Sequence, residues 1–67
     1  MNISPKKGDF VKTPQVESDY LTSNKSYQIK KVFSDNSFVI LDDNGKKLYC
    51  QPTKDGHLND SDWIFEN

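Results

Sequence analysis

The chain has 67 residues, a formal net charge of −1 and a single cysteine, Cys50. A chain of this length forms one domain with a small core, so we expect a single domain over residues 1–67 and no deep active site. A lone cysteine excludes an internal disulfide, and no apolar run approaches the roughly 20 residues of a membrane span. We expect a cytoplasmic protein without membrane contact.

The charged residues are unevenly distributed along the chain. All nine basic residues are lysines. Because guanine recognition and bidentate phosphate binding usually use arginine, sequence-specific DNA recognition is disfavoured, although lysine can still contact phosphate. The last thirteen residues contain no lysine and four acidic residues, namely Asp55, Asp60, Asp62 and Glu66.

The N-terminal third predicts one short strand and a long loop. Residues 1–7 are expected to form a flexible leader because Pro5 disfavours regular structure. Residues 10–12 read as a strand that Pro14 ends. The polar residues 13–24 predict a long surface loop from which Tyr20 or Leu21 covers the core.

Residues 26–51 predict a three-stranded antiparallel meander, because two apolar runs rich in β-branched and aromatic residues end in turn-forming residues. Tyr27 and Ile29 are at odd positions and would face one side of a strand, whereas Val32 is at an even position and would face the other. A β-bulge near Lys30-Lys31 would bring all three to one side, and we therefore predict one there. Asn44-Gly45 predicts a two-residue type I′ turn with positive φ at both positions.

This turn places Leu41 opposite Leu48 and Val39 opposite Cys50, and a turn at Asp35-Asn36 places Val32 opposite Val39. The predicted core is Ile29, Val32, Val39, Leu41 and Leu48. The opposite face contains Phe33, Phe38, Ile40 and Tyr49, with Asp42 and Lys47 as an ion pair. This second face either belongs to the core of a closed barrel or binds a partner, and a slip of one residue would exchange the two faces.

The C-terminal part predicts a loop and a closing strand. Pro52 ends the preceding strand, and the chain turns around Asp55-Gly56. Residues 63–65 should pair with residues 10–12, because closing the sheet removes exposed edges. The expected architecture is all-β, a small five-stranded SH3-like barrel with a long first loop.

Three motifs resemble small SH3-like proteins of bacteriophages and prophages. They are Lys7-Gly8-Asp9-Phe10-Val11, Leu21-Thr22 with Lys25-Ser26-Tyr27-Gln28-Ile29, and Asp42-Asp43-Asn44-Gly45. The resemblance implies an accessory or host-takeover factor that binds and blocks a protein of the bacterial host, such as nucleic-acid-processing or defence machinery. The longer segment between Pro52 and Trp63 departs from the family pattern.

The sequence indicates no catalysis, metal or cofactor. His57 is the only histidine and lies in a polar loop without a nucleophile signature, so we expect a solvated residue. The acidic residues lack the spacing of a calcium-binding loop. Cys50 is expected to be a small core residue. The prediction is therefore a binding protein and not an enzyme.

Two binding hypotheses remain. A protein partner would contact large aromatic rings, with acidic residues guiding the approach to a basic patch. The candidate residues for this role are Tyr20, Phe33, Phe38, Tyr49, Asp60, Asp62 and Trp63. Alternatively, lysines beside aromatic rings would bind single-stranded nucleic acid without sequence preference. The candidates for this role are Lys30, Lys31, Lys46 and Lys47.

Overall fold

A computed structural model describes residues 5–66, and the all-β prediction is confirmed. The elements in chain order are β1 (Phe10–Lys12), β2 (Ser26–Gln28), β3 (Lys31–Val32), β4 (Phe38–Leu41), β5 (Lys47–Cys50), the 3-10 helix η1 (Gly56–Leu58) and β6 (Ile64–Glu66). Residues 1–4 of the expected leader lie outside the described part, Pro5 is buried, and the chain turns between Lys6 and Asp9.

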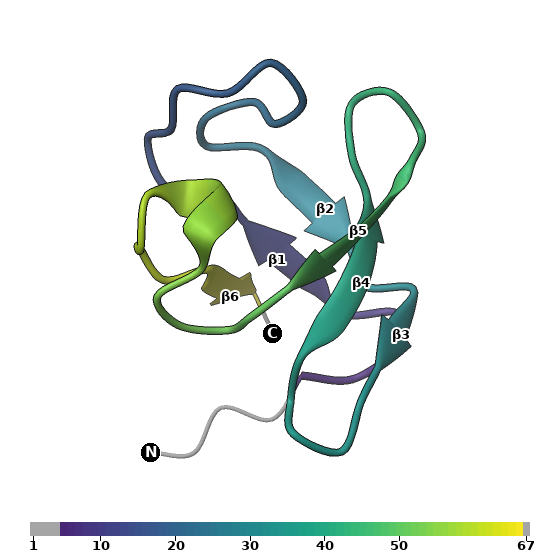
Figure 1. Cartoon of the computed structure of the whole chain (residues 1–67). Helices are drawn as coiled ribbons and strands as arrows, with labels where there is room; N and C mark the ends of the chain where they lie inside the picture. Colours follow the sequence, from purple (N-terminus) through teal and green to yellow (C-terminus); the bar gives the residue numbers. More distant parts are fainter. Residues whose placement is uncertain (1–4, 67) are drawn as a thin grey trace.

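The strands form two antiparallel sheets, with strand orders β2-β1-β6 and β3-β4-β5 (Figure 1). The pairing of β6 with β1 confirms the neighbour predicted for the closing strand. Within residues 5–66 the sheets are not joined into a closed barrel. The chain passes between them at Ile29, whose N–H donates to Asp9 O, and Lys30, whose N–H donates to Val39 O. This transition lies next to Lys30-Lys31, where the alternation of apolar residues breaks and a bulge was predicted.

The β4–β5 hairpin has a three-residue turn and not the predicted two-residue turn. Asp42 N donates to Lys46 O, and Gly45 N donates to Asp42 O, each at 2.9 Å. Gly45 has a φ of 78°, whereas Asn44 is not among the residues with positive φ. The pattern is that of a type I turn followed by a left-handed residue. The type I′ prediction is therefore wrong.

The longer turn shifts the register by one residue and exchanges the two faces of β4, while Leu48 and Tyr49 of β5 keep their predicted sides. Leu48 is opposite Ile40, and Lys47 is opposite Leu41. Phe38 and Ile40 are consequently buried in the core, while Leu41 is 39% exposed. The predicted core position of Leu41 is wrong, and so is the predicted pair of Lys47 with Asp42.

The β3–β4 hairpin has the same geometry. Asn36 N donates to Phe33 O, and Asn36 has a φ of 71° in the position that Gly45 occupies in the other hairpin. Val32 is therefore opposite Phe38 and not opposite Val39. Asparagine suits this position because its side chain tolerates the left-handed conformation.

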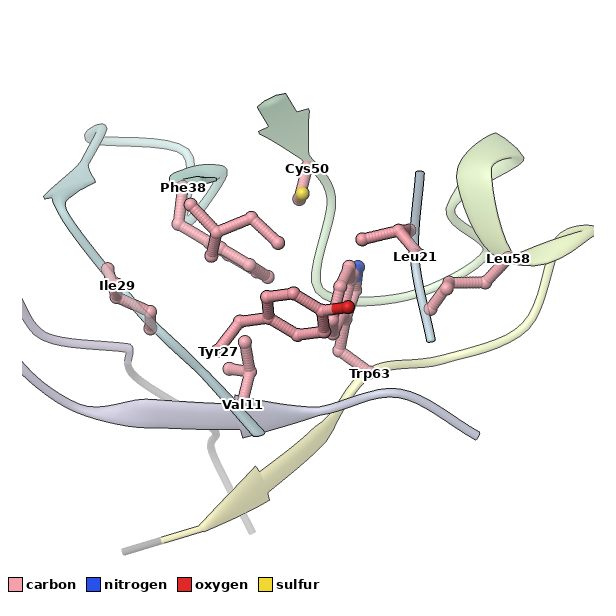
Figure 2. Close-up of a cluster of buried hydrophobic side chains, with 9 residues drawn as sticks. Val11, Leu21, Tyr27, Ile29, Phe38, Cys50, Leu58 and Trp63 are labelled. Atoms are coloured by element: carbon pink, nitrogen blue, oxygen red, sulfur yellow. The ribbon is translucent and has the colours of Figure 1, made fainter. Parts of the chain in front are cut away.

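The core lies between the two sheets (Figure 2). The Trp63 ring meets the Phe38 ring edge to face at 5.7 Å and the Tyr27 ring at 6.3 Å. Within the predicted core set, Ile29 is buried in this cluster, and Val39 is buried but lies outside it. Val32 and Leu48 are partly buried and pack against the cluster. The buried cluster contains Val11, Leu21, Tyr27, Ile29, Phe38, Ile40, Cys50, Leu58 and Trp63.

The loop between β1 and β2 covers one end of this core. Leu21 is buried and Tyr20 packs against the cluster, which confirms the predicted cover. Thr13 anchors the two ends of the loop, because its backbone bonds to Lys25 O and Asn24 N and its hydroxyl donates to Thr22 O. The loop is therefore fastened to the sheet rather than extended into solvent.

Candidate binding surface

The outward-facing side of the β3-β4-β5 sheet combines apolar and basic side chains. Val39 is opposite both Lys31 and Tyr49, so these three residues share one face. Lys47 and Leu41 form the next pair on that face. We call this surface the outer sheet face, and its members are Lys31, Phe33, Val39, Leu41, Lys47 and Tyr49.

The outer sheet face carries a stacked aromatic pair, Phe33 and Tyr49. The Phe33 and Tyr49 rings lie 6.0 Å apart at an interplanar angle of 21°. Tyr49 is 67% exposed, the largest fraction among the exposed large hydrophobic residues in the described chain. The Lys31 ammonium lies 5.1 Å from the centre of the Phe33 ring, a cation–π arrangement. The two rings thus remain packed on each other while Tyr49 faces solvent.

Two of the five aromatic residues predicted to contact a partner lie in the core instead. Phe38 is buried because the register turns it inward. Trp63 is buried because its indole N–H donates to the buried Asp55 carboxylate at 2.7 Å. Tyr20 belongs to the first loop and is half-buried against the core. Neither Phe38 nor Trp63 is therefore a surface contact.

The four candidate lysines divide into two groups. Lys31 and Lys47 lie on the outer sheet face. Lys30 instead directs its ammonium to Gln28 Oε1 at 3.2 Å, and Lys46 lies at the end of the β4–β5 turn. The fold therefore brings together residues from both binding hypotheses, the aromatic pair and two of the lysines.

Asp43 fastens the β4–β5 hairpin to the first loop. Its carboxylate accepts hydrogen bonds from Thr22 Oγ1 at 2.7 Å, Lys25 Nζ at 2.9 Å and Tyr27 Oη at 2.8 Å. These bonds, led by the one from Thr22, lower the pKa of Asp43 to about 2. The Asp43 bond raises the pKa of Lys25. Asp43 thus forms an ion pair with Lys25, a lysine of the first loop.

A polar cleft of about 450 Å³ lies between the first loop and η1. His57 is half-buried there, with Nδ1 2.9 Å from Tyr20 Oη and Nε2 3.1 Å from Tyr49 O. Because a carbonyl can only accept, Nε2 donates to Tyr49. The expectation of a solvated histidine is wrong. Residues lining the cleft are Glu17, Ser18, Asp19, Tyr20, Gly56, His57 and Asn59.

The C-terminal acidic residues belong to a different part of the molecule from the aromatic pair. Asp55 is buried and accepts hydrogen bonds from Gln51 N, His57 N and Trp63 Nε1. Asp60 and Asp62 are exposed in the loop after η1, where Asp62 accepts from a backbone N–H. Asp55 therefore organises this loop, while the other two face solvent.

Sequence reasoning missed the bridging role of His57 and the exposure of Leu41. Tyr20 and His57 are 37 residues apart, and no local pattern reports such a contact. The exposure of Leu41 did have a signal, since Asp at the first turn position and Gly at the fourth favour a type I turn followed by a left-handed glycine.

No group of three or more His, Cys, Asp or Glu side chains within residues 5–66 is placed to hold a metal ion. In the same stretch, no helix has the length and apolar character needed to cross a membrane. Comparisons with protein-family models, curated proteins and solved structures found no match.

Proposed function

We propose that the chain is a non-catalytic, SH3-like binding module that binds a protein of a bacterial host through the outer sheet face and inhibits or redirects it. The observation that supports this best is the exposed Tyr49 ring, stacked on Phe33 on a hydrogen-bonded sheet. Large rigid rings concentrate binding energy at interfaces, and a sheet holds them in place.

The strand count and the motif resemblance support the SH3-like fold and the phage origin in this proposal. Counting β2 and β3 as one bent strand leaves five strands, and a long loop follows the first. The motif resemblance to small phage proteins supports an accessory factor that acts in the host cytoplasm by binding and blocking. With Phe38 and Trp63 in the core, Tyr49 and Phe33 are the contact residues of this proposal.

Affinity capture from a bacterial lysate tests the proposed function. We expect a stoichiometric protein that survives nuclease treatment, is lost with Tyr49→Ala and is retained with Phe10→Ala. Phe10 is a matched control, because it is 46% exposed but lies in the other sheet. Equal capture by both variants, read by mass spectrometry, would contradict the use of the outer sheet face.

Non-specific binding of single-stranded nucleic acid is the second candidate function. It is favoured by the position of Lys31 and Lys47 on the same face as the stacked rings, since bases stack on aromatic side chains and lysines neutralise phosphates. The net charge of −1 and the absence of arginine count against it. Nuclease-sensitive capture would support this candidate.

A further inference from the structure

The lysines of the outer sheet face have no carboxylate partner within the described chain. Across residues 5–66, the one ion pair joins Lys25 to Asp43. Lys31 and Lys47 are both exposed, and the Lys31 ammonium lies over the Phe33 ring. Their charges are therefore available to a partner.

The carboxylates of the two hairpin turns are used in local hydrogen bonds. Asp35 accepts from the backbone N–H and the hydroxyl of Ser37, at 3.1 and 2.6 Å. Asp42 accepts from the backbone N–H groups of Asn44 and Lys46, both at 2.9 Å. Because these bonds hold the carboxylates at the turns, the face remains cationic in a chain whose net charge is −1.

The arrangement of charge and apolar area on this face suits an interface. Tyr49 and Phe33 form the aromatic part of this face, and Leu41 on the central strand β4 adds a 39% exposed side chain. Lys31 and Lys47 come from the two outer strands, β3 and β5. Interfaces commonly place aromatic residues at the centre and charges at the rim, where complementary charge increases the association rate.

Building on the proposed function, we infer that the partner segment bound by the outer sheet face is acidic, with an apolar or aromatic residue between its carboxylates. The carboxylates would pair with Lys31 and Lys47, and the apolar residue would pack on Tyr49. A protein segment fits better than nucleic acid, because the exposed Tyr49 ring offers apolar contact and the chain lacks the arginine that usually forms bidentate phosphate contacts.

A labelled glutamate–tyrosine copolymer is a defined probe for this chemistry. Its binding is measured by fluorescence anisotropy in about 50 mM and about 300 mM salt, because screening weakens exposed charge pairs. Oligothymidylate of matched length is the nucleic-acid probe. The test variant is Lys31→Glu with Lys47→Glu, and the matched control is Lys6→Glu with Lys7→Glu, which changes the net charge equally on exposed residues near the N-terminus.

We expect the copolymer to bind the wild-type protein, more weakly in high salt. The Lys31→Glu and Lys47→Glu variant should bind about tenfold more weakly, while the control changes affinity by about twofold or less. Equal loss in both variants, or no binding of the copolymer, overturns the inference. Tighter binding of oligothymidylate that is lost with the same variant also overturns it and assigns the face to nucleic acid.

Lysate capture with the same variants separates this inference from the proposed function. If the Tyr49→Ala variant no longer captures the protein but the Lys31→Glu and Lys47→Glu variant still does, the proposed function stands and the inference of an acidic partner segment is overturned. A protein retained by all of these variants overturns both. Circular dichroism verifies that each variant is folded, and Lys31→Gln with Lys47→Gln replaces the double variant if it unfolds.

Discussion

Replacing Asp55 with alanine should unfold much of the protein. The Asp55 carboxylate is buried and accepts three hydrogen bonds, from Gln51 N at 3.0 Å, His57 N at 3.0 Å and Trp63 Nε1 at 2.7 Å. These bonds connect the end of β5, η1 and the residue that precedes β6. Alanine leaves all three donors without this acceptor, and the Trp63 indole is itself buried.

The magnitude follows from the number and kind of bonds lost. A hydrogen bond to a charged group contributes about 1.5–3 kcal/mol, and an unsatisfied buried donor costs about 1–3 kcal/mol. Water can reach the two backbone N–H groups once the loop loosens, so we expect a loss of about 3–5 kcal/mol in the free energy of unfolding. A core in a domain of this size rarely supplies more than about 3–5 kcal/mol, so the loss approaches the whole stability.

Urea unfolding followed by circular dichroism measures this loss, with Trp63 fluorescence as a second probe because the chain has one tryptophan. Asp55→Asn is the conservative control, since it keeps one acceptor oxygen and should cost about 1–3 kcal/mol. In a Trp63→Phe background the cost of Asp55→Ala should fall by about 1 kcal/mol or more, because no indole N–H remains unsatisfied. A change below about 0.5 kcal/mol for Asp55→Ala in the wild type would refute this account.

Three further predictions concern single positions. Gly45→Ala should cost about 1–2 kcal/mol because of the positive φ alone, since a Cβ there meets no atom within 4 Å. Gly56 has the same open space but no positive φ, so Gly56→Ala should change stability by less than about 0.5 kcal/mol in the same urea assay. Asp43 has a folded pKa of about 2, below the unfolded value of about 4, so its stabilisation is complete above about pH 4 and is lost as the pH falls towards 2. Urea midpoints should therefore decrease over this range in the wild type and less steeply in Asp43→Asn, and parallel curves would argue against the Asp43 contacts. Burial raises the pKa of the Cys50 thiol, so Ellman's reagent should label it only upon unfolding, and rapid labelling of the folded protein would contradict its core position.

Much of the strand layout could be predicted because it depends on local patterns. The first strand at residues 10–12 and the cover by Leu21 were predicted correctly. The predicted turn regions at Asn36 and Gly45 also contain the left-handed residues. The predicted length of the β4–β5 turn was wrong, and the one extra residue there exchanged the inner and outer faces of β4.

The candidate binding surface was predicted only in part for the same reason. Tyr49 and Phe33 were named from their aromatic character and do lie outside the core. Phe38 and Trp63 have the same character, but the register and the bond to Asp55 place them inside. Residue type alone could not distinguish the two pairs, because interfaces and cores both favour large rings.

The sequence by itself determined the all-β class, most of the strand positions and the turn regions, because β-branched runs, prolines and left-handed residues act over a few neighbouring positions. It did not show that residues 26–28 pair with β1 rather than with the meander. Tertiary structure alone decided which face of the β3-β4-β5 sheet is exposed and which distant residues meet, such as Tyr20 with His57. A pleated strand presents its side chains to both sides equally, so burial is settled only when the register and the opposing sheet are in place.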